Sequence, residues 1–329
     1  MITYGISIIL IVIAAAMTAV GTGILIPILK KQQMGQNIRE EGPESHKKKA
    51  GTPSMGGIAI IAGALITSLI GLAVTKDPRV TDMFVILISF ALFGALGFVD
   101  DYLKVIKKEN EGLKVIPKFT AQFVISLLLA IYMTVVSEHA TTVMIPFIAR
   151  SVDFGVFYIP FIVFTMLAMV NAVNLTDGLD GLAAGTTGIV SVTLGIVAVG
   201  TGAVSSGVFL MAMAGACAGF LVFNKNPAKV FMGDTGSLAL GGGLTVAAIV
   251  MRMELLLPIA GIIYVAEALS VCMQVGYFKA TGGKRIFRMT PLHHHFELGG
   301  MSEKKVVVSF WIVTLCACLI SLGSIWRLM

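Results

Sequence analysis

The amino-acid sequence predicts an all-α membrane protein with ten transmembrane helices, arranged as a single domain over residues 1–329. Composition supports this first: 57% of the residues are hydrophobic, only 13% are charged, and the mean hydropathy is +0.92. The apolar residues also form long runs, and a membrane span needs roughly 17–25 of them. Lipid-exposed backbone must satisfy its own hydrogen bonds, and the alternating segments of a β-barrel are absent. These runs are therefore expected to be helices.

In chain order, the ten runs are joined by mostly short connections, which leave no room for a separate soluble domain. The first run has no basic stretch before it and no evident cleavage site, so it is expected to be a retained span and not a signal peptide. The sixth and seventh runs are separated by little more than residues 200–203. The runs cover roughly residues 2–29, 55–74, 83–99, 119–137, 154–173, 183–203, 206–223, 235–251, 255–278 and 306–326.

The basic residues predict the orientation, because cytoplasmic connections are enriched in Lys and Arg. Of the 24 Lys and Arg residues, alternate connections on one side hold only five, which leaves 19 for the other side. The basic side is predicted to be cytoplasmic, with both termini outside. The net charge of +6 is then a collar that suits anionic headgroups and phosphorylated substrates, and not a nucleic-acid surface. The five are Lys76, Arg79, Arg150, Arg252 and Arg327.

A polar stretch at the end of the fifth run is the main candidate for a site. Asn171, Asn174, Asp177 and Asp180 follow the uncharged segment 154–170 at intervals of three residues. On a helix this spacing keeps side chains near one face. A polar face at the end of a span is costly unless it meets water, a cation or a substrate. A solvated loop with a helix cap is the alternative interpretation.

Two adjacent carboxylates, Asp100 and Asp101, end the third run, also on the cytoplasmic side. They repel each other, and a helix C-terminus disfavours anions. Something must compensate for this repulsion. One candidate is Lys104, four residues after Asp100. The other is Mg²⁺, which typically takes one or two carboxylates plus substrate phosphates.

Three more features lie in the second half of the chain. Asp234 stands in Gly-Asp-Thr-Gly-Ser at the start of the eighth run, where free backbone N–H groups suit an anion or an anion–metal complex; a plain helix cap is the alternative. The sequence His293-His294-His295 in the last cytoplasmic connection suits contacts to a phosphate or sugar better than a metal, because zinc motifs space their ligands; a surface loop with no role is the alternative. Glu267 lies mid-way in the ninth run, and an intramembrane acid is a functional hypothesis, with bonding inside the bundle as the alternative.

Taken together, these motifs resemble those of the polyprenyl-phosphate N-acetylhexosamine-1-phosphate transferases, and within that superfamily the muramoyl-pentapeptide branch. The likeness covers essentially the whole chain. Ser54 departs from the pattern, which often has Thr there, but it keeps the hydroxyl. The motifs are His46-x-x-Lys49-x-Gly-Thr-Pro, Asp100-Asp101-Tyr-x-Lys104, Asn174-Leu-Thr-Asp-Gly-Leu-Asp-Gly-Leu, Asn224 with Phe231-Met-Gly-Asp-Thr-Gly-Ser, and Pro291-Leu-His-His-His-Phe-Glu297.

The resemblance implies a reaction in a bacterial cytoplasmic membrane. Undecaprenyl phosphate attacks the sugar-linked phosphate of UDP-N-acetylmuramoyl-pentapeptide, UMP leaves, and lipid I remains in the bilayer as a step of peptidoglycan synthesis. Mg²⁺ is the implied cofactor, acting as a Lewis acid. Direct attack and an aspartyl-phosphate intermediate both stay open. Whether two copies form a homodimer also stays open.

The same resemblance implies the roles of individual residues. Asp234 is expected to hold the metal, with Asp101 supporting it, and Asp100 to deprotonate or orient the lipid phosphate. His293 and His294 are grouped with these catalytic residues, facing the diphosphate or the sugar. The residues expected to bind substrate are Lys49, Lys104 and Lys118 at phosphates, Asn174, Asp177, Asp180, Asn224 and Phe231 at the nucleoside, and Asn171, Ser237 and His295 nearby.

Two other functions compete with this one. A sibling enzyme would transfer N-acetylglucosamine-1-phosphate to the same lipid. An ion-coupled secondary transporter would use Glu267 and the other acids as an ion path. Transporter sites lie near the midplane between repeats, whereas here the acids gather at one face and no repeat is visible.

Overall fold

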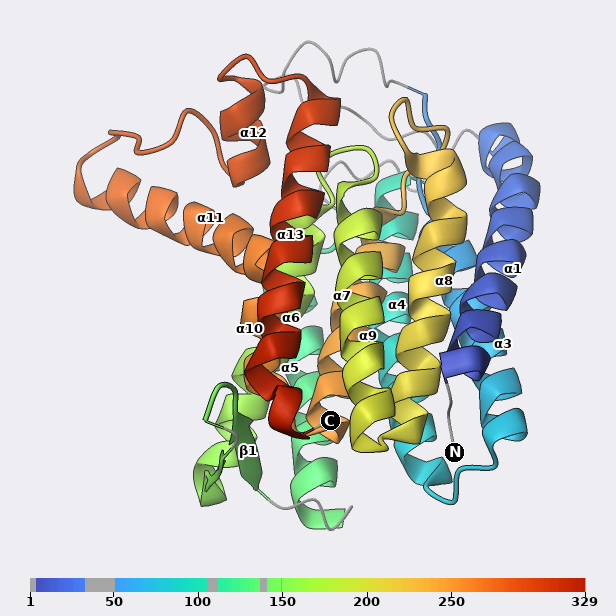
Figure 1. The fold of residues 1–329 in the computed structure, drawn as a ribbon. Coiled ribbons are helices and arrows are strands. Elements are labelled where there is room, and N and C mark those ends of the chain that lie inside the picture. The colour runs from blue at the N-terminus through green and yellow to red at the C-terminus, as the bar shows by residue number, and fades with distance from the viewer. Residues whose placement is uncertain (1–3, 33–50, 106–111, 137–140, 149, 329) are drawn as a thin grey trace.

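The computed structural model describes residues 4–32, 51–105, 112–136, 141–148 and 150–328, and these form a bundle of long helices (Figure 1). Lys49 and His46 lie outside the described residues. The elements are α1 (Tyr4–Lys31), α3 (Gly57–Thr75), α4 (Val80–Val105), α5 (Val115–Ile131) continued by a π-helical turn (Tyr132–Val136), β1 (Thr142–Ile145), β2 (Arg150–Asp153), a 3₁₀ turn (Gly155–Phe157), α6 (Tyr158–Thr176), α7 (Leu182–Thr201), α8 (Val204–Asn224), α9 (Gly233–Val250), a 3₁₀ turn (Glu254–Leu256), α10 (Leu257–Ala260), α11 (Ile262–Ala280), α12 (Leu292–Glu297), α13 (Glu303–Ile325) and a last 3₁₀ turn (Trp326–Leu328).

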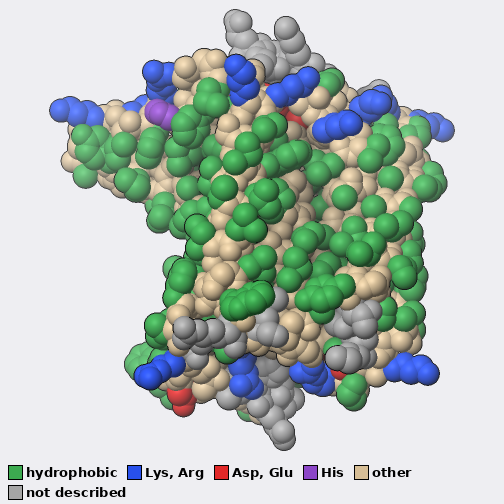
Figure 2. All heavy atoms as spheres, viewed as in Figure 1, with side chains coloured by type: hydrophobic (Ala, Val, Ile, Leu, Met, Phe, Trp, Pro, Cys, Tyr) green, Lys and Arg blue, Asp and Glu red, His purple; other side chains and the backbone are tan. Residues whose placement is uncertain are grey.

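Nine of these helices are long and apolar enough to span a membrane. Their bounds lie within a few residues of the predicted runs, and the tight connection between α7 and α8 is confirmed, with Gly202 in the left-handed conformation that ends α7. Figure 2 shows green apolar side chains over the middle of the surface and Lys and Arg side chains at its two ends. This pattern agrees with a polytopic membrane protein.

The ninth predicted run differs from the prediction of one straight span over residues 255–278. It is broken into Glu254–Ala260 and Ile262–Ala280, which meet at an angle of 82°. Gly261 separates the two parts, and α11 leans out of the bundle (Figure 1). Hydropathy measures how apolar a run is and not its direction, so the break was invisible to it.

The interior of the bundle is built by α7, α8 and α9, the most buried of the candidate spans. α8 packs against α1, α3 and α7, whereas α9 packs against α4 and α6. In the residues that the structure describes, the expectation of an all-α chain holds apart from one small antiparallel hairpin, in which Thr142 of β1 faces Asp153 of β2. Val143 and Met144 of this hairpin are buried.

The two ends of the bundle differ in what they carry. α1 begins and α13 ends at the end where the hairpin lies, and α12 lies at the opposite end (Figure 1). Because successive helices alternate in direction, the ends of α4 and α6 and the starts of α5 and α9 are brought together, as the contacts between their side chains show. The predicted polar motifs therefore meet at one end of the bundle.

Candidate active site

The close approach of α4 and α9 is what places the carboxylates side by side. A methyl group on Gly97 of α4 would overlap the backbone of Asp234, so the two helices touch there without a side chain between them. Gly233 opens α9 with φ +71°, a conformation that favours glycine, and a methyl group there would overlap the Asp101 carboxylate. Glycine is thus needed at both positions for this contact.

Asp101 holds the start of α9. Its two carboxylate oxygens accept hydrogen bonds from the backbone N–H of Asp234 (3.0 Å), the backbone N–H of Thr235 (2.9 Å) and the Thr235 hydroxyl (2.6 Å). The first N–H groups of a helix have no partner inside the helix, and the helix dipole favours an anion there. Asp101 therefore fixes where Asp234 lies.

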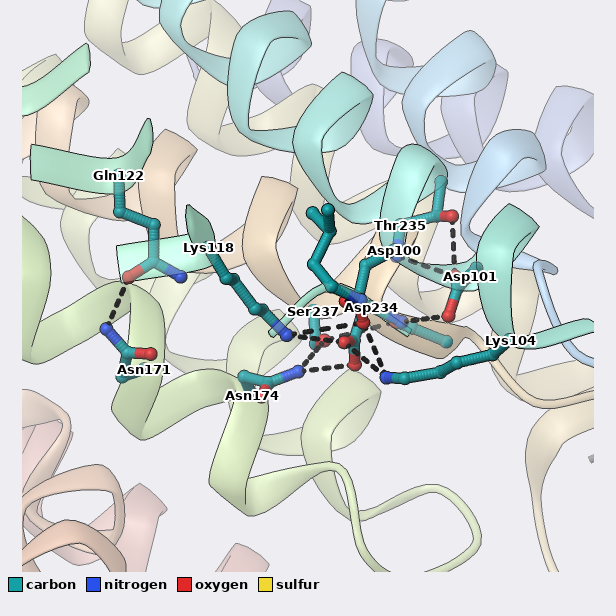
Figure 3. A network of polar contacts seen from close by, with 12 residues as sticks. Asp100, Asp101, Lys104, Lys118, Gln122, Asn171, Asn174, Asp234, Thr235 and Ser237 are labelled. Carbon is teal, nitrogen blue, oxygen red and sulfur yellow. Dashed lines mark hydrogen bonds and ion pairs between the residues drawn. The ribbon is translucent and has the colours of Figure 1, made fainter. Parts of the chain in front are cut away.

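Two lysines link Asp100 and Asp234 (Figure 3). The Lys104 ammonium lies 2.5 Å from Asp100 Oδ2 and 2.9 Å from Asp234 Oδ2. The Lys118 ammonium lies 3.4 Å and 2.6 Å from the same two oxygens. The backbone N–H of Leu113 also donates to Asp100 Oδ1 at 2.8 Å. The pairing of Asp100 with Lys104 four residues later, expected as one way to offset the repulsion, is confirmed.

The polar face of α6 joins the same network. The Asn174 amide donates to Asp234 Oδ1 at 2.8 Å and lies 2.9 Å from the Ser237 hydroxyl. One turn earlier, Asn171 donates to the Gln122 side chain at 2.7 Å, and Gln122 is buried. Gln122 was not found from the sequence. Gln122 lies four residues after Lys118, and this spacing places both side chains on one face of α5.

The prediction of one continuous helical face for the four polar residues is wrong, because α6 ends at Thr176. Asp177 and Asp180 lie in the turn that follows. Burial raises the pKa of the Asp177 carboxyl well above its usual range, and the negative charges of Asp234 and Asp101 raise it further. The backbone N–H of Asp177 donates to the Asn174 carbonyl at 3.2 Å, but its carboxyl has no hydrogen-bond partner among the residues that the structure describes.

Asp180 and Asn224 hold that turn against the segment between α8 and α9. Asp180 Oδ2 accepts hydrogen bonds from the Asn226 side chain and from the backbone N–H of Ala228, both at 3.0 Å. Asn224 accepts from the backbone N–H of Gly181 at 3.1 Å and donates to the Val230 carbonyl at 2.9 Å. Both side chains are buried. Their expected contact with a nucleoside stays a prediction, and their structural contacts were not visible in the sequence.

Phe231 is held by its backbone. Its N–H donates to the Pro53 carbonyl and its own carbonyl accepts from Gly56, both at 2.8 Å. The side chain is partly exposed. The Gly-Thr-Pro-Ser segment thus lies beside the start of α9, and the expected stacking of Phe231 on a base stays a prediction.

The three histidines differ from one another, although all lie on α12. His293 is buried, and its ring Nδ1 lies 3.1 Å from Glu267 Oε2. His294 Nδ1 lies 3.0 Å from Glu297, and His295 Nδ1 accepts from the backbone N–H of Arg288 at 3.1 Å. The three rings therefore have separate partners, and their expected contact with a phosphate or sugar stays a prediction. The alternative for Glu267, bonding inside the bundle, is what the structure shows.

Oxygen donors in this cluster suit Mg²⁺. Within the described ranges, no three His, Cys, Asp or Glu side chains converge closely enough to hold a metal by themselves. Mg²⁺ typically takes one or two carboxylates and fills its shell with substrate phosphates and water, so a site with few protein ligands fits it. Asp177, with its uncompensated carboxyl beside Asp234, also favours an added cation. Asp101 has both oxygens engaged by backbone N–H groups at the start of α9, which suits support of the site better than direct ligation. The partners of Asp234 are side chains, which can turn away to admit a cation.

Comparison with known proteins agrees with this arrangement. The model for glycosyl transferase family 4 matches residues 83–252, and signature 1 of the phospho-N-acetylmuramoyl-pentapeptide-transferases matches residues 49–61. The phospho-N-acetylmuramoyl-pentapeptide-transferase of Listeria innocua serovar 6a is 48% identical over 309 residues, which cover 94% of this chain and 95% of that protein. The protein of the same name from Caldanaerobacter subterraneus subsp. tengcongensis is 47% identical over 300 residues, covering 91% and 92%.

The bundle and its carboxylate–lysine cluster thus define a membrane-embedded transferase of glycosyl transferase family 4. Within that class, the chain belongs to the phospho-N-acetylmuramoyl-pentapeptide-transferase family.

Proposed function

We propose that this protein transfers phospho-N-acetylmuramoyl-pentapeptide from UDP to undecaprenyl phosphate, giving lipid I and UMP in peptidoglycan synthesis. The observation that carries this proposal is the Lys118 ammonium between Asp100 and Asp234, at the end of an apolar bundle. A lipid acceptor needs a site that the membrane can reach, and a diphosphate donor needs fixed positive charge. The names and high identities of the relatives support the choice of sugar.

In the proposed reaction, an oxygen of the lipid phosphate bonds to the sugar-linked phosphorus, and the bond from that phosphorus to the UMP oxygen breaks. Asp100 accepts the proton of the lipid phosphate or orients the phosphate, and Lys104 and Lys118 offset the charge of the reacting phosphates. Catalysis of phosphoryl transfer rests largely on such positioning and charge stabilisation. When bound, Mg²⁺ would supply Lewis-acid stabilisation of the departing UMP, held by Asp234 with Asp101 behind it.

The remaining residues are proposed to bind the donor. Phe231 would stack on uracil, with Asn174, Asp177, Asp180 and Asn224 around the nucleoside and Asn171 and Ser237 completing the polar lining. His293 and His294 would face the diphosphate or sugar, with His295 beside them, and Lys49 would contribute a further positive charge.

The proposed orientation places this site at the cytoplasmic face of a bacterial cytoplasmic membrane, with both termini outside. The excess of Lys and Arg in the connections at the site end supports it. The nucleotide-linked donor is a soluble molecule made in the cytoplasm, so a site facing that side can be supplied directly.

Purified protein incubated with undecaprenyl phosphate and each of two UDP-sugars tests this function. We expect UMP release from UDP-N-acetylmuramoyl-pentapeptide and very little from UDP-N-acetylglucosamine, since a site built for polar groups of the peptide arm rejects a sugar that leaves them unpaired. Equal release from both would assign the chain to the sibling branch. Removal of divalent cations with EDTA should abolish release and Mg²⁺ should restore it, and Asp234→Asn should raise the Mg²⁺ concentration required.

A further inference from the structure

Glu267 is a buried acid that the proposed reaction does not use. It lies on α11, one and a half turns after the break at Gly261, and none of its surface is exposed. A buried carboxylate is costly unless its oxygens accept hydrogen bonds. Both of its oxygens meet one residue, His293 of α12: Oε1 accepts from the backbone N–H at 3.2 Å, and Oε2 lies 3.1 Å from ring Nδ1. Because a carboxylate can only accept, the second contact requires the ring proton on Nδ1.

The other ring nitrogen of His293, Nε2, is buried and makes no hydrogen bond with any residue that the structure describes. It points to the turn after α6, where a methyl group added to Gly178 would overlap it. Buried polar atoms are nearly always hydrogen-bonded, so an unpaired Nε2 indicates a ligand that binds there. Gly178 follows Asp177 directly, which places this atom beside the polar turn of the candidate active site.

We propose that Glu267 is a positioning residue for the transferase reaction: it fixes α12 and the proton on His293 Nδ1, and so presents Nε2 at the Gly178 turn to the phosphate-linked sugar of the donor. Glu267 does not touch substrate; it acts through His293. The inference rests on the proposed function for its ligand, but the state of the ring is a property of the free protein.

The two hydrogen bonds decide what a substitution does. A carboxylate accepts two hydrogen bonds, one on each oxygen, whereas a glutamine amide has one oxygen and one NH₂ group. In Glu267→Gln, an oxygen facing the backbone N–H leaves NH₂ facing Nδ1, and that forces the proton onto Nε2. The opposite amide orientation sets NH₂ against the backbone N–H. The first orientation keeps two hydrogen bonds but moves the ring proton, and the second loses the hydrogen bond to the backbone N–H, although the size of the side chain hardly changes.

Kinetics of the purified protein provide the first test. We expect Glu267→Gln to lower kcat about tenfold to a hundredfold, the usual loss when a residue that orients a reactive histidine is changed. The KM for UDP-N-acetylmuramoyl-pentapeptide should change by less than about threefold, because the nucleoside contacts lie elsewhere. In a His293→Gln background the same substitution should cost nothing more, since Glu267 acts through that ring. If Glu267→Gln lowered kcat by the same factor in the His293→Gln background as in the parent, the proposal would be overturned.

A matched control is available at the first residue of the same broken span. Glu254 is also a buried acid, 1% exposed, and it accepts a hydrogen bond from Tyr158 at 2.7 Å. Glu254→Gln should keep kcat within about twofold of the parent when it purifies as a folded protein. An equal loss of kcat in Glu254→Gln and Glu267→Gln would mean that burial of any acid here matters, and would overturn the positioning role.

The ring itself gives a readout that needs no substrate. In ¹⁵N-histidine spectra of the full-length protein, the His293 signal is identified as the one that His293→Gln removes. The parent should show a protonated Nδ1, and Glu267→Gln should show the proton on Nε2 or a mixture. A parent ring with a bare Nδ1 would overturn the proposal even with an active enzyme. A parent that releases no UMP while its Nδ1 is protonated would instead count against the proposed function.

Discussion

Asp101, near the end of α4, accepts a hydrogen bond from the backbone N–H of Asp234, the second residue of α9, at 3.0 Å. The same carboxylate also binds Thr235 through its backbone N–H and its hydroxyl. One aspartate of the Asp100-Asp101 pair therefore holds the helix that carries Asp234, and the other shares two lysines with Asp234. Adjacent residues in the sequence thus have different structural tasks.

This division of tasks predicts a difference between two substitutions. Asp101→Asn replaces one accepting oxygen with an NH₂ group, which cannot accept a hydrogen bond from the N–H groups at the start of α9. Losing a hydrogen bond to a charged group costs about 1.5–3 kcal/mol. We expect a lower melting temperature in detergent and at least a hundredfold loss of UMP release, roughly the effect of a misplaced catalytic group. Asp153→Asn, on exposed β2, is the control and should change neither value. A stable Asp101→Asn protein with near-parent activity would remove the positioning role.

Lys118 should be needed for its charge. Its ammonium lies between Asp100 and Asp234, so Lys118→Gln leaves two carboxylates without that cation. Activity should fall about a hundredfold, the scale of losing one placed charge-stabilising group. Lys114 directly precedes the same helix but is exposed, and Lys114→Gln should keep activity within about twofold. UMP release at saturating donor measures both, and equal losses would show that only the general basic character of this end matters.

The Asp177 carboxylate is expected to lower the stability of the folded protein while it supports activity. Because the folded pKa of its carboxyl is raised above the ordinary value of 3.8, the folded state holds the proton more tightly than the unfolded state. The associated stability is present at low pH and is lost as pH rises through the folded pKa. Asp177→Asn should therefore raise the melting temperature at pH 8, and this gain should shrink as the pH is lowered toward 4.

Activity of the same variant should fall, since Asp177 lies in the proposed binding site of the donor and the cation. Melting curves in detergent at several pH values, with UMP release at neutral pH, measure the two effects. A melting temperature below that of the parent at pH 8 would show that an interaction of Asp177 stabilises the fold and that its charge is not a burden.

The helical spans could be predicted from the sequence because length and hydropathy are local properties. The contacts that give the site its shape could not, since they join residues far apart in the chain: Asp101 with Thr235, Glu267 with His293, and Asp180 with Asn226. The break at Gly261 was missed for a related reason. A glycine inside an apolar run permits a bend, but only the packing of the bundle decides whether the bend forms.

Orientation in the membrane can be tested by labelling single cysteines in intact cells. Cys272 and Cys316 are exposed and would first be replaced by alanine. We expect Lys229→Cys and Lys284→Cys to react only with reagents that reach the cytoplasm, and Lys76→Cys and Arg150→Cys to react from outside, because basic connections stay inside. Labelling of position 229 or 284 from the external face would show that the orientation is opposite to the predicted one.

The most direct measurement follows the phosphate that the donor sugar carries. UDP-N-acetylmuramoyl-pentapeptide labelled with ³²P in the sugar-linked phosphate is incubated with undecaprenyl phosphate, Mg²⁺ and the purified protein. Transfer of the sugar together with its phosphate predicts that label enters the organic phase in equal amount to the UMP released, and that Asp234→Asn reduces both together. Label that stays in the water phase, as UDP or as a free sugar phosphate, would contradict the proposed reaction.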